Sequence, residues 1–243
     1  MRFGMNDNDT QTHTGPSNFQ YTGVRFERLK NAGYTLVCIL VDTTGSTMGY
    51  VNDFHKLILK VIGACRAHPM KESLLIRVCE FNSSIGVKEI HGFIPVINTK
   101  DSDYPSLVAQ GATPLYDAMY SAVGSVDDYA RQLTDKEYNV NGVAFTITDG
   151  GNTHSAVGLR DVKTLMEGAV SGEHLESFRH ILIAAGAEVS HLASDAKLAG
   201  AEYVPIGSAD EKNLAKLADF ISGSISATSQ SQGTGGPSQP LTF

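Results

Sequence analysis

One uninterrupted apolar run, Thr35–Val41 (TLVCILV), limits the fold of this chain more than any other feature. A run of this length and composition is typical of a β-strand covered on both faces, as in a parallel sheet packed between helices. Apolar residues then recur at helical spacing from Val51 to Cys65, which predicts an amphipathic helix. A buried strand followed by such a helix favours an α/β fold.

The same alternation continues through most of the chain. Further strands are expected at Leu74–Phe81, Val143–Ile147, Ile181–Ala185 and Tyr203–Ile206, with an edge strand and its hairpin at Val87–Ile97. Further helices are expected at Leu115–Val126, Val162–Ala169, Val189–Leu198 and Leu214–Ile221. We therefore predict a Rossmann-like three-layer α/β/α fold, with a mainly parallel central sheet and one antiparallel edge strand.

The two ends of the chain differ from this pattern. Residues 1–20 and 226–243 are polar and rich in Asn, Thr, Ser, Gln and Gly. Such segments bury too little apolar surface to offset the entropy that ordering costs. We predict a disordered N-terminal tail at 1–20, one domain at 21–225 and a flexible C-terminal tail at 226–243.

Charge and cysteine content narrow the class of protein. The formal net charge is −7 and the pI is about 5.6, which argues against general binding to nucleic acid or to an anionic membrane. The three cysteines lie in apolar periodic segments, and their odd number indicates buried free thiols of a reducing compartment. The sequence shows neither the apolar core of a signal peptide nor a run of about 20 apolar residues. We therefore expect a cytoplasmic protein.

Oxygen-bearing side chains follow two of the expected strands and precede one helix. Asp42, Thr44 and Ser46 follow the first strand, Asp149 follows the strand Val143–Ile147, and Thr113 precedes a helix. Ligands of parallel sheets bind at the carboxyl ends of the strands, so these groups are expected to converge. Carboxylates and hydroxyls without Cys or His suit a hard cation. We predict a Mg²⁺ site, with Mn²⁺ or Ca²⁺ as alternatives.

These residues resemble the metal-ion-dependent adhesion site (MIDAS) of the von Willebrand factor A (vWA) family. That site combines Asp-x-Ser-x-Ser after the first strand, a Thr in a later loop and an Asp after the fourth strand. The matches here are Asp42, Thr44 and Ser46, then Thr113, then Asp149. The resemblance covers about residues 33–224, and Thr44 stands where the family usually has Ser.

The resemblance implies a binding module and not an enzyme. In the family, the two carboxylates and three hydroxyls hold the metal directly or through water, and an open coordination position takes an Asp or Glu of a partner protein. The type that this chain resembles is the stand-alone intracellular domain of prokaryotes or phages. Such domains often occur with an AAA+ ATPase, a kinase or a phosphatase of the same system, and these are the partner classes that the resemblance suggests.

Four residues near the expected site are candidates for a partner-binding rim. They are Tyr50, Asn52, Asn152 and His154.

Each site residue also has a structural interpretation. Thr113 before Pro114 is a good helix N-cap, and Thr44 or Ser46 is suited to capping the helix that follows. Asp149-Gly150 is an ordinary turn dipeptide. The expected order and context of all five residues together favour the metal site.

Two other classes of function are alternatives. One is a constitutive structural or assembly subunit. The other is a Mg²⁺-dependent phosphatase or ATPase, but a haloacid-dehalogenase-type phosphatase needs an Asp where this chain has Thr44, and Thr is no general acid–base group at neutral pH. An actin-like ATPase would continue from Asp42 into a hairpin, whereas a helical pattern follows here.

Overall fold

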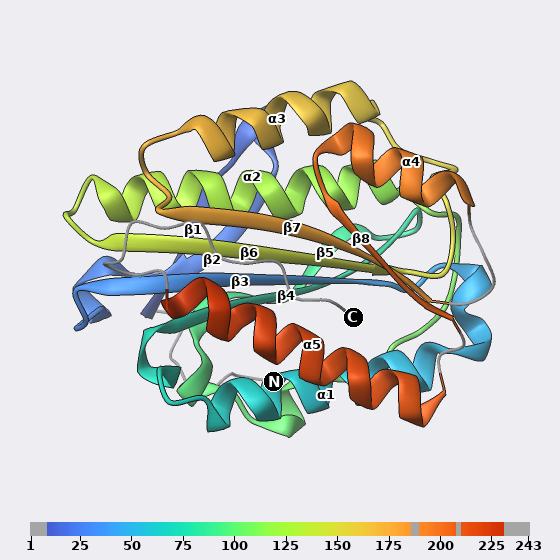
Figure 1. Cartoon of the computed structure of the whole chain (residues 1–243), viewed down its shortest axis with the longest axis horizontal. Coiled ribbons are helices and arrows are strands. Elements are labelled where there is room, and N and C mark those ends of the chain that lie inside the picture. The colour runs from blue at the N-terminus through green and yellow to red at the C-terminus, as the bar shows by residue number, and fades with distance from the viewer. Residues whose placement is uncertain (1–8, 186–189, 208–209, 231–243) are drawn as a thin grey trace.

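The computed structural model describes residues 9–185, 190–207 and 210–230, and within them it contains one eight-stranded sheet (Figure 1). The strands are β1 (Thr10–Thr14), β2 (Gln20–Val24), β3 (Gly33–Asp42), β4 (Leu74–Asn82), β5 (Gly86–Pro95), β6 (Asn139–Thr148), β7 (Ser177–Ala185) and β8 (Glu202–Gly207). Their order across the sheet is β1-β2-β5-β4-β3-β6-β7-β8. The α-helices are α1 (Val51–Ala67), α2 (Leu115–Thr134), α3 (Leu159–Ser171), α4 (Ser190–Ala199) and α5 (Glu211–Gln230).

The helices cover the two faces of the sheet, which confirms the predicted three-layer α/β/α architecture. Figure 1 shows α2, α3 and α4 on one face and α1 and α5 on the other. Strand β3 is central and pairs in parallel with both β4 and β6. The carboxyl ends of these strands therefore lie along one edge of the layered structure.

The buried strand β3 explains why the chain folds in this way. Leu36, Cys38 and Leu40 belong to the core under α2, α3 and α4. Val37, Ile39 and Val41 alternate with them and belong to the core under α1 and α5. Because successive side chains of a strand point to opposite faces, a strand buried on both faces must be apolar throughout.

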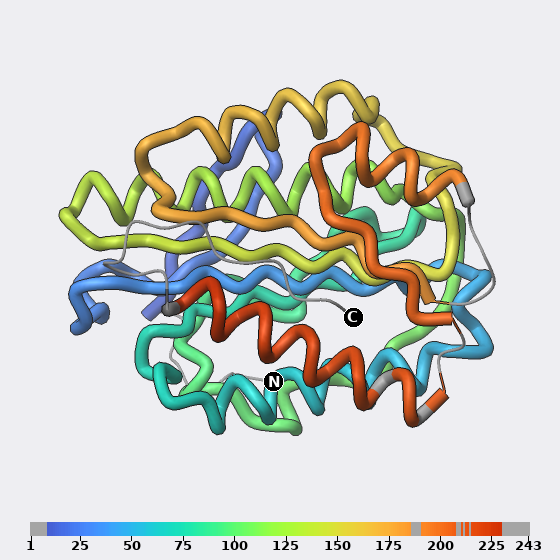
Figure 2. Tube along the Cα trace, in the orientation of Figure 1, coloured from blue at the N-terminus to red at the C-terminus, as the bar shows by residue number. Residues whose placement is uncertain are grey.

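The N-terminal region differs from the prediction of a disordered tail at residues 1–20. Strands β1 and β2 form an antiparallel hairpin in which Thr10 pairs with Val24 and Thr14 with Gln20. The hairpin, blue in Figure 2, reaches towards α2 and α3. Although its composition is polar, this segment contributes to a small aromatic core, in which His13 stacks on Tyr21 and lies edge-on to Tyr129. Residues 1–8 lie outside the described residues.

A buried polar network joins this hairpin to the rest of the sheet. Nε of Arg77, on β4, donates to Oε1 of Glu89, on β5, over 2.7 Å. Oε2 of the same carboxylate accepts a hydrogen bond of 2.7 Å from the hydroxyl of Thr22, on β2. Strands β2 and β5 share only one register pair, Gly23 with Phe93, so these side-chain bonds supplement a short backbone pairing.

The hairpin also means that β5 lies inside the sheet and not at its edge. Strand β5 is antiparallel to β4, as expected for Val87–Ile97. It is not an edge strand, however, because β2 pairs with its other side and β1 follows β2. The edge prediction was wrong because the hairpin was assigned to a disordered tail.

The C-terminal helix is longer than expected. Helix α5 continues to Gln230, so residues 226–230 of the predicted flexible tail are helical. The buried hydroxyl of Ser229, on α5, lies 3.0 Å from that of Thr35, on β3. Residues 231–243 of the predicted tail lie outside the described residues.

The cysteines and the character of the helices bear on two general predictions. The three cysteines, Cys38, Cys65 and Cys79, are buried and free, as expected. Among the helices of residues 9–185, 190–207 and 210–230, none has the length and apolar character that crossing a membrane requires.

Candidate metal-binding site

Asp42 ends β3 and forms the buried floor of the candidate site. Its Oδ1 accepts a hydrogen bond of 2.8 Å from the backbone N–H of Thr44, and its Oδ2 accepts one of 2.6 Å from the hydroxyl of Thr148. The side chain is fully buried. Burial raises the pKa of this carboxyl to about 6, although the hydrogen bonds from Thr148 and Thr44 oppose the shift.

Three hydroxyls continue from this floor towards the surface. The hydroxyl of Thr113 lies 3.3 Å from that of Thr44, which lies 3.0 Å from that of Ser46. The Ser46 hydroxyl donates to Oδ1 of Asp149 over 2.8 Å. Together with the bond between Asp42 and the Thr44 amide, these contacts link all five predicted residues into one cluster.

Asp149 is the second carboxylate and lies nearer to the surface than Asp42. Its pKa is raised, mainly because partial burial removes water from the charged form. The hydrogen bond from Ser46 opposes this shift. Both carboxyls therefore lie in surroundings that disfavour a bare negative charge, and a bound cation would relieve this cost.

The loop that carries Thr113 is fixed against the neighbouring strand ends. The N–H of Gly45 donates to the carbonyl of Gly111 over 3.0 Å, and the N–H of Ser83 donates to the carbonyl of Ala112 over 2.9 Å. Gly111 has a φ of +71°, a left-handed conformation that glycine adopts without the strain that a residue with a Cβ would have. A Cβ at this position would also lie 2.7 Å from the Ser83 hydroxyl oxygen.

The N-terminus of α2 is capped by Ser155 rather than by Thr113. The Ser155 hydroxyl accepts hydrogen bonds of 2.9 and 3.2 Å from the N–H groups of Tyr116 and Asp117. Pro114 takes the N-cap position without a side-chain capping bond, and the Thr113 hydroxyl donates to that of Thr44. The capping interpretation of Thr113 is therefore wrong, and its hydroxyl belongs to the polar cluster.

The four predicted rim residues have different surroundings. Asn52 and His154 are exposed, and the backbone N–H of His154 donates to the carbonyl of Thr113 over 3.1 Å. Tyr50 is half-buried and stacks on Phe54. Asn152 is half-buried, and its Oδ1 accepts a hydrogen bond from Ser155.

The sequence interpretation missed two residues beside the cluster. Thr148 directly precedes Asp149 and holds Asp42 through its hydroxyl. Met48 lies two residues beyond Ser46 and is 71% exposed, the largest exposed fraction among the large apolar side chains described. Thr148 could be predicted from the sequence, because it is the last residue of a buried strand. The exposure of Met48 depends on the short helical turn Gly45–Gly49, which the sequence pattern did not predict.

The donor set is distinct from an acidic or histidine-rich metal centre. In the part of the chain that the structure describes, no group of three or more His, Cys, Asp or Glu residues could hold a metal ion. A cation at the cluster would instead meet two carboxylates and three hydroxyls. This all-oxygen set fits Mg²⁺, Mn²⁺ or Ca²⁺.

Comparison of structures shows a vWA-like fold. The chain resembles a von Willebrand factor type A protein from Catenulispora acidiphila, with a TM-score of 0.52 and 13% identity over 86% of this chain and 44% of that one. It also resembles the pilus adhesin SpaC from Lactobacillus rhamnosus GG in an open conformation, with a TM-score of 0.60 and 11% identity over 91% of this chain and 35% of the adhesin. A third similar structure is proximal thread matrix protein 1 from the mussel byssus, with a TM-score of 0.54 and 16% identity over 80% of this chain and 47% of that protein.

The chain spans less than half the length of each of these three proteins. No protein-family model matches the chain, and no curated protein matches its sequence. At these identities the likeness concerns the fold alone.

Proposed function

We propose that this chain is a divalent-metal-dependent protein-binding module, in which a Mg²⁺ ion takes an acidic side chain of a partner protein. One observation carries the proposal: five oxygen-bearing residues from three separate segments meet in one hydrogen-bonded cluster at the carboxyl edge of the sheet. This is the edge at which folds of this kind bind ligands.

The residues fit a hard cation in number and in chemistry. Asp42 and Asp149 would supply the negative charge, and Thr44, Ser46 and Thr113 would supply neutral oxygens. A metal held largely by neutral hydroxyls keeps much of its charge, so it offers an incoming carboxylate a strong contact. Mn²⁺ and Ca²⁺ are alternative ions, because the same donors suit both.

The surface beside the cluster supports access by a partner. Ser46 is exposed, and so is Met48, the apolar side chain that follows it. Methionine is enriched at protein interfaces relative to the rest of the protein surface. The partner would present an Asp or Glu, and an AAA+ ATPase, a kinase or a phosphatase of the same system is the class we propose.

The proposal includes no catalytic step. Thr44 stands where a phosphatase of the alternative type needs an acid–base carboxylate. Asp42 leads into the turn Gly45–Gly49 and then into α1, not into a hairpin. Phosphatase or ATPase turnover that Ser46→Ala abolishes would overturn this part of the proposal.

The expected setting is the cytoplasm. Three buried free thiols fit a reducing compartment. The net charge of −7 gives no support to binding of nucleic acid or an anionic membrane.

A capture experiment tests the proposed function. The purified chain is incubated with host lysate in Mg²⁺ and in EDTA, beside a Ser46→Ala variant in Mg²⁺. Ser46 suits this test better than Asp42, because Asp42 is buried and holds the turn through the Thr44 amide. We expect a partner that only the wild type retains, and only in Mg²⁺.

A partner retained in all three conditions would contradict metal-bridged recognition. It would favour the alternative of a constitutive structural or assembly subunit. For a partner retained by the wild type only in Mg²⁺, replacing its acidic residues with amides would identify the carboxylate that reaches the metal.

A further inference from the structure

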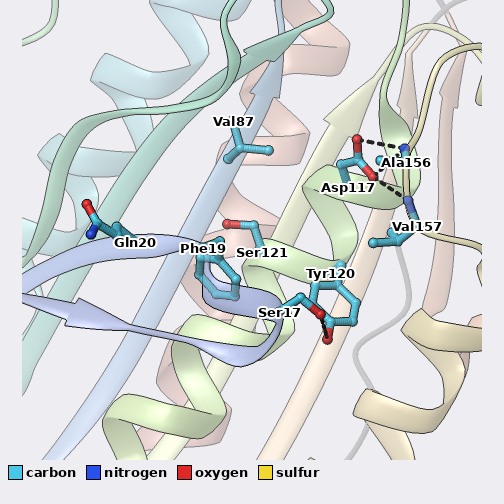
Figure 3. A pocket seen from close by; sticks show the side chains of 9 residues that line it. All are labelled: Ser17, Phe19, Gln20, Val87, Asp117, Tyr120, Ser121, Ala156 and Val157. Carbon is cyan, nitrogen blue, oxygen red and sulfur yellow. Dashed lines mark hydrogen bonds between the residues drawn. The ribbon is translucent and has the colours of Figure 1, made fainter.

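A cavity of about 290 Å³ lies between the N-terminal hairpin, α2 and the segment that precedes α3 (Figure 3). The hairpin contributes Ser17 and Phe19, and α2 contributes Asp117, Tyr120 and Ser121. None of the five residues of the candidate metal site lines this cavity. The cavity is therefore separate from the candidate metal site.

The hairpin turn holds an unusual shape at the cavity. Ser17 and Asn18 both have left-handed backbone conformations, with φ values of 56° and 63°. Such conformations are unfavourable for residues other than glycine and tend to cluster where a structure clamps a ligand. Here they turn the chain so that Ser17 and Phe19 both reach the cavity.

The ring of Phe19 is held in place from two sides. A Cβ on Gly15 would lie 2.5 Å from this ring, and a Cβ on Gly124, on α2, would lie 3.0 Å from it. Phe19 therefore packs directly on the backbone at both glycines. The Ser17 hydroxyl lies 2.9 Å from that of Tyr120, which fixes the second aromatic ring of the cavity.

The electrostatic character of the lining favours a cation. Of the nine lining residues, only Asp117 carries a charge. Its Oδ1 accepts hydrogen bonds of 2.9 Å from the N–H groups of Ala156 and Val157, and its Oδ2 accepts a longer one of 3.1 Å from Ala156. A carboxylate has about four acceptor positions, so Oδ2 keeps capacity for a further donor. Aromatic faces beside a carboxylate attract cations.

We propose that this cavity binds a basic side chain, arginine or lysine, from a partner polypeptide. The cavity is at the lower end of the range of about 300–1,000 Å³ that is usual for small-molecule sites, which suits a single side chain. The aliphatic stem would lie against Phe19 and Tyr120, and the charged end would approach Oδ2 of Asp117. This proposal does not depend on metal binding at the other site.

Titration with capped amino acids tests the proposal. The probes are N-acetyl-arginine amide, N-acetyl-lysine amide and the neutral isostere N-acetyl-citrulline amide, and binding is followed by NMR of the backbone amides. We expect a basic probe to shift the amides of Phe19, Tyr120 and Val157. It should bind about tenfold more tightly than the citrulline probe, which lacks the charge.

Matched variants assign the binding to the cavity. Asp117→Asn should weaken the basic probe to the level of the citrulline probe, whereas Asp219→Asn, the same change on an exposed carboxylate of α5, should leave binding unaltered. Tyr120→Leu should also weaken binding, and it spares the hydrogen bonds of Asp117. Equal binding of charged and neutral probes, or no shift of the cavity amides, would overturn the proposal.

Discussion

The hydroxyl of Ser46 donates a hydrogen bond of 2.8 Å to Oδ1 of Asp149, although the two residues are 103 positions apart. The contact arises because β3 and β6 are parallel neighbours, with Val41 paired to Ile147. Strands paired in this register end at the same level, so the residues that follow them meet. Ser46 and Asp149 would both help to hold a cation at this site, directly or through water.

The first prediction concerns stabilisation by metal. We expect Mg²⁺ at about 100 times its dissociation constant to raise the free energy of unfolding of the wild type by about 2.7 kcal/mol, because the ion binds the folded state alone. Ser46→Ala should lose this gain. Without metal, the same variant should differ from wild type by less than about 0.5 kcal/mol, as is usual for an exposed side chain.

Urea unfolding in EDTA and in Mg²⁺ measures both quantities. Ser171→Ala, which removes an exposed hydroxyl on α3, is the matched control and should keep the full response to metal. An equal response in wild type and Ser46→Ala would place the metal elsewhere.

The second prediction separates metal binding from helix capping. Thr113→Ala should abolish binding of Mg²⁺ and leave the stability of the metal-free protein nearly unchanged, because its hydroxyl donates to Thr44 and the N–H groups of α2 bond to Ser155. Ser155→Ala should leave Mg²⁺ binding unchanged and destabilise the metal-free protein. It removes the acceptor for two N–H groups of α2, and loss of a cap costs about 1 kcal/mol.

Calorimetric titration with Mg²⁺ and urea unfolding in EDTA distinguish the two variants. Unfolding of the metal-free Thr113→Ala variant would show that its hydroxyl mainly serves the fold.

The third prediction concerns the buried network of Arg77 and Glu89. Arg77 is 1% exposed, and its charge is paired with the Glu89 carboxylate over 2.7 Å. Glu89→Leu should cost about 3–5 kcal/mol, because it leaves a buried charge without its partner. The double variant Arg77→Met, Glu89→Leu should recover a large part of this loss, because no uncompensated charge remains.

Urea unfolding of the two single variants and the double variant completes a thermodynamic cycle. A double variant that is less stable than Glu89→Leu would contradict this account and would mean that the network is needed for packing of the hairpin.

The five residues of the candidate site could be predicted because each lies next to a strongly patterned element. Asp42 ends one apolar strand, Asp149 follows another, and Thr113 precedes an amphipathic helix. The carboxyl ends of neighbouring parallel strands meet by geometry alone. The capping role of Ser155 could not be predicted, because it depends on how a loop some 40 residues away docks on α2: Ser155 lies 39 positions from Tyr116.

The N-terminal hairpin shows what sequence patterns miss. Thr10–Thr14 shows no alternation of apolar and polar residues, so the strand could not be predicted from hydrophobic periodicity. The hairpin is held by tertiary contacts, namely the edge-on packing of His13 against Tyr129 and the hydrogen bond from the Thr22 hydroxyl to Glu89. These contacts depend on residues distant in sequence, and the sequence of the hairpin itself does not reveal them.

The fourth prediction is that His180 makes the protein less stable in acid. This side chain on β7 is buried, and its Nε2 lies 3.0 Å from the Thr146 hydroxyl. Burial lowers the pKa of His180 from 6.5 to about 4. Between these two values the unfolded state takes up a proton that the folded state does not, so stability falls as the pH falls from about 6.5 to about 4. The contribution is of the order of 3 kcal/mol, at about 1.4 kcal/mol for each pKa unit.

His180→Gln can keep a hydrogen bond to Thr146 and cannot titrate, so its difference in unfolding free energy from wild type should shrink as the pH falls. Asn52→Gln, an exposed control without a titratable group, should keep a constant difference. Urea unfolding at several pH values in EDTA measures both, and parallel curves for wild type and His180→Gln would show that His180 is not buried in its neutral form.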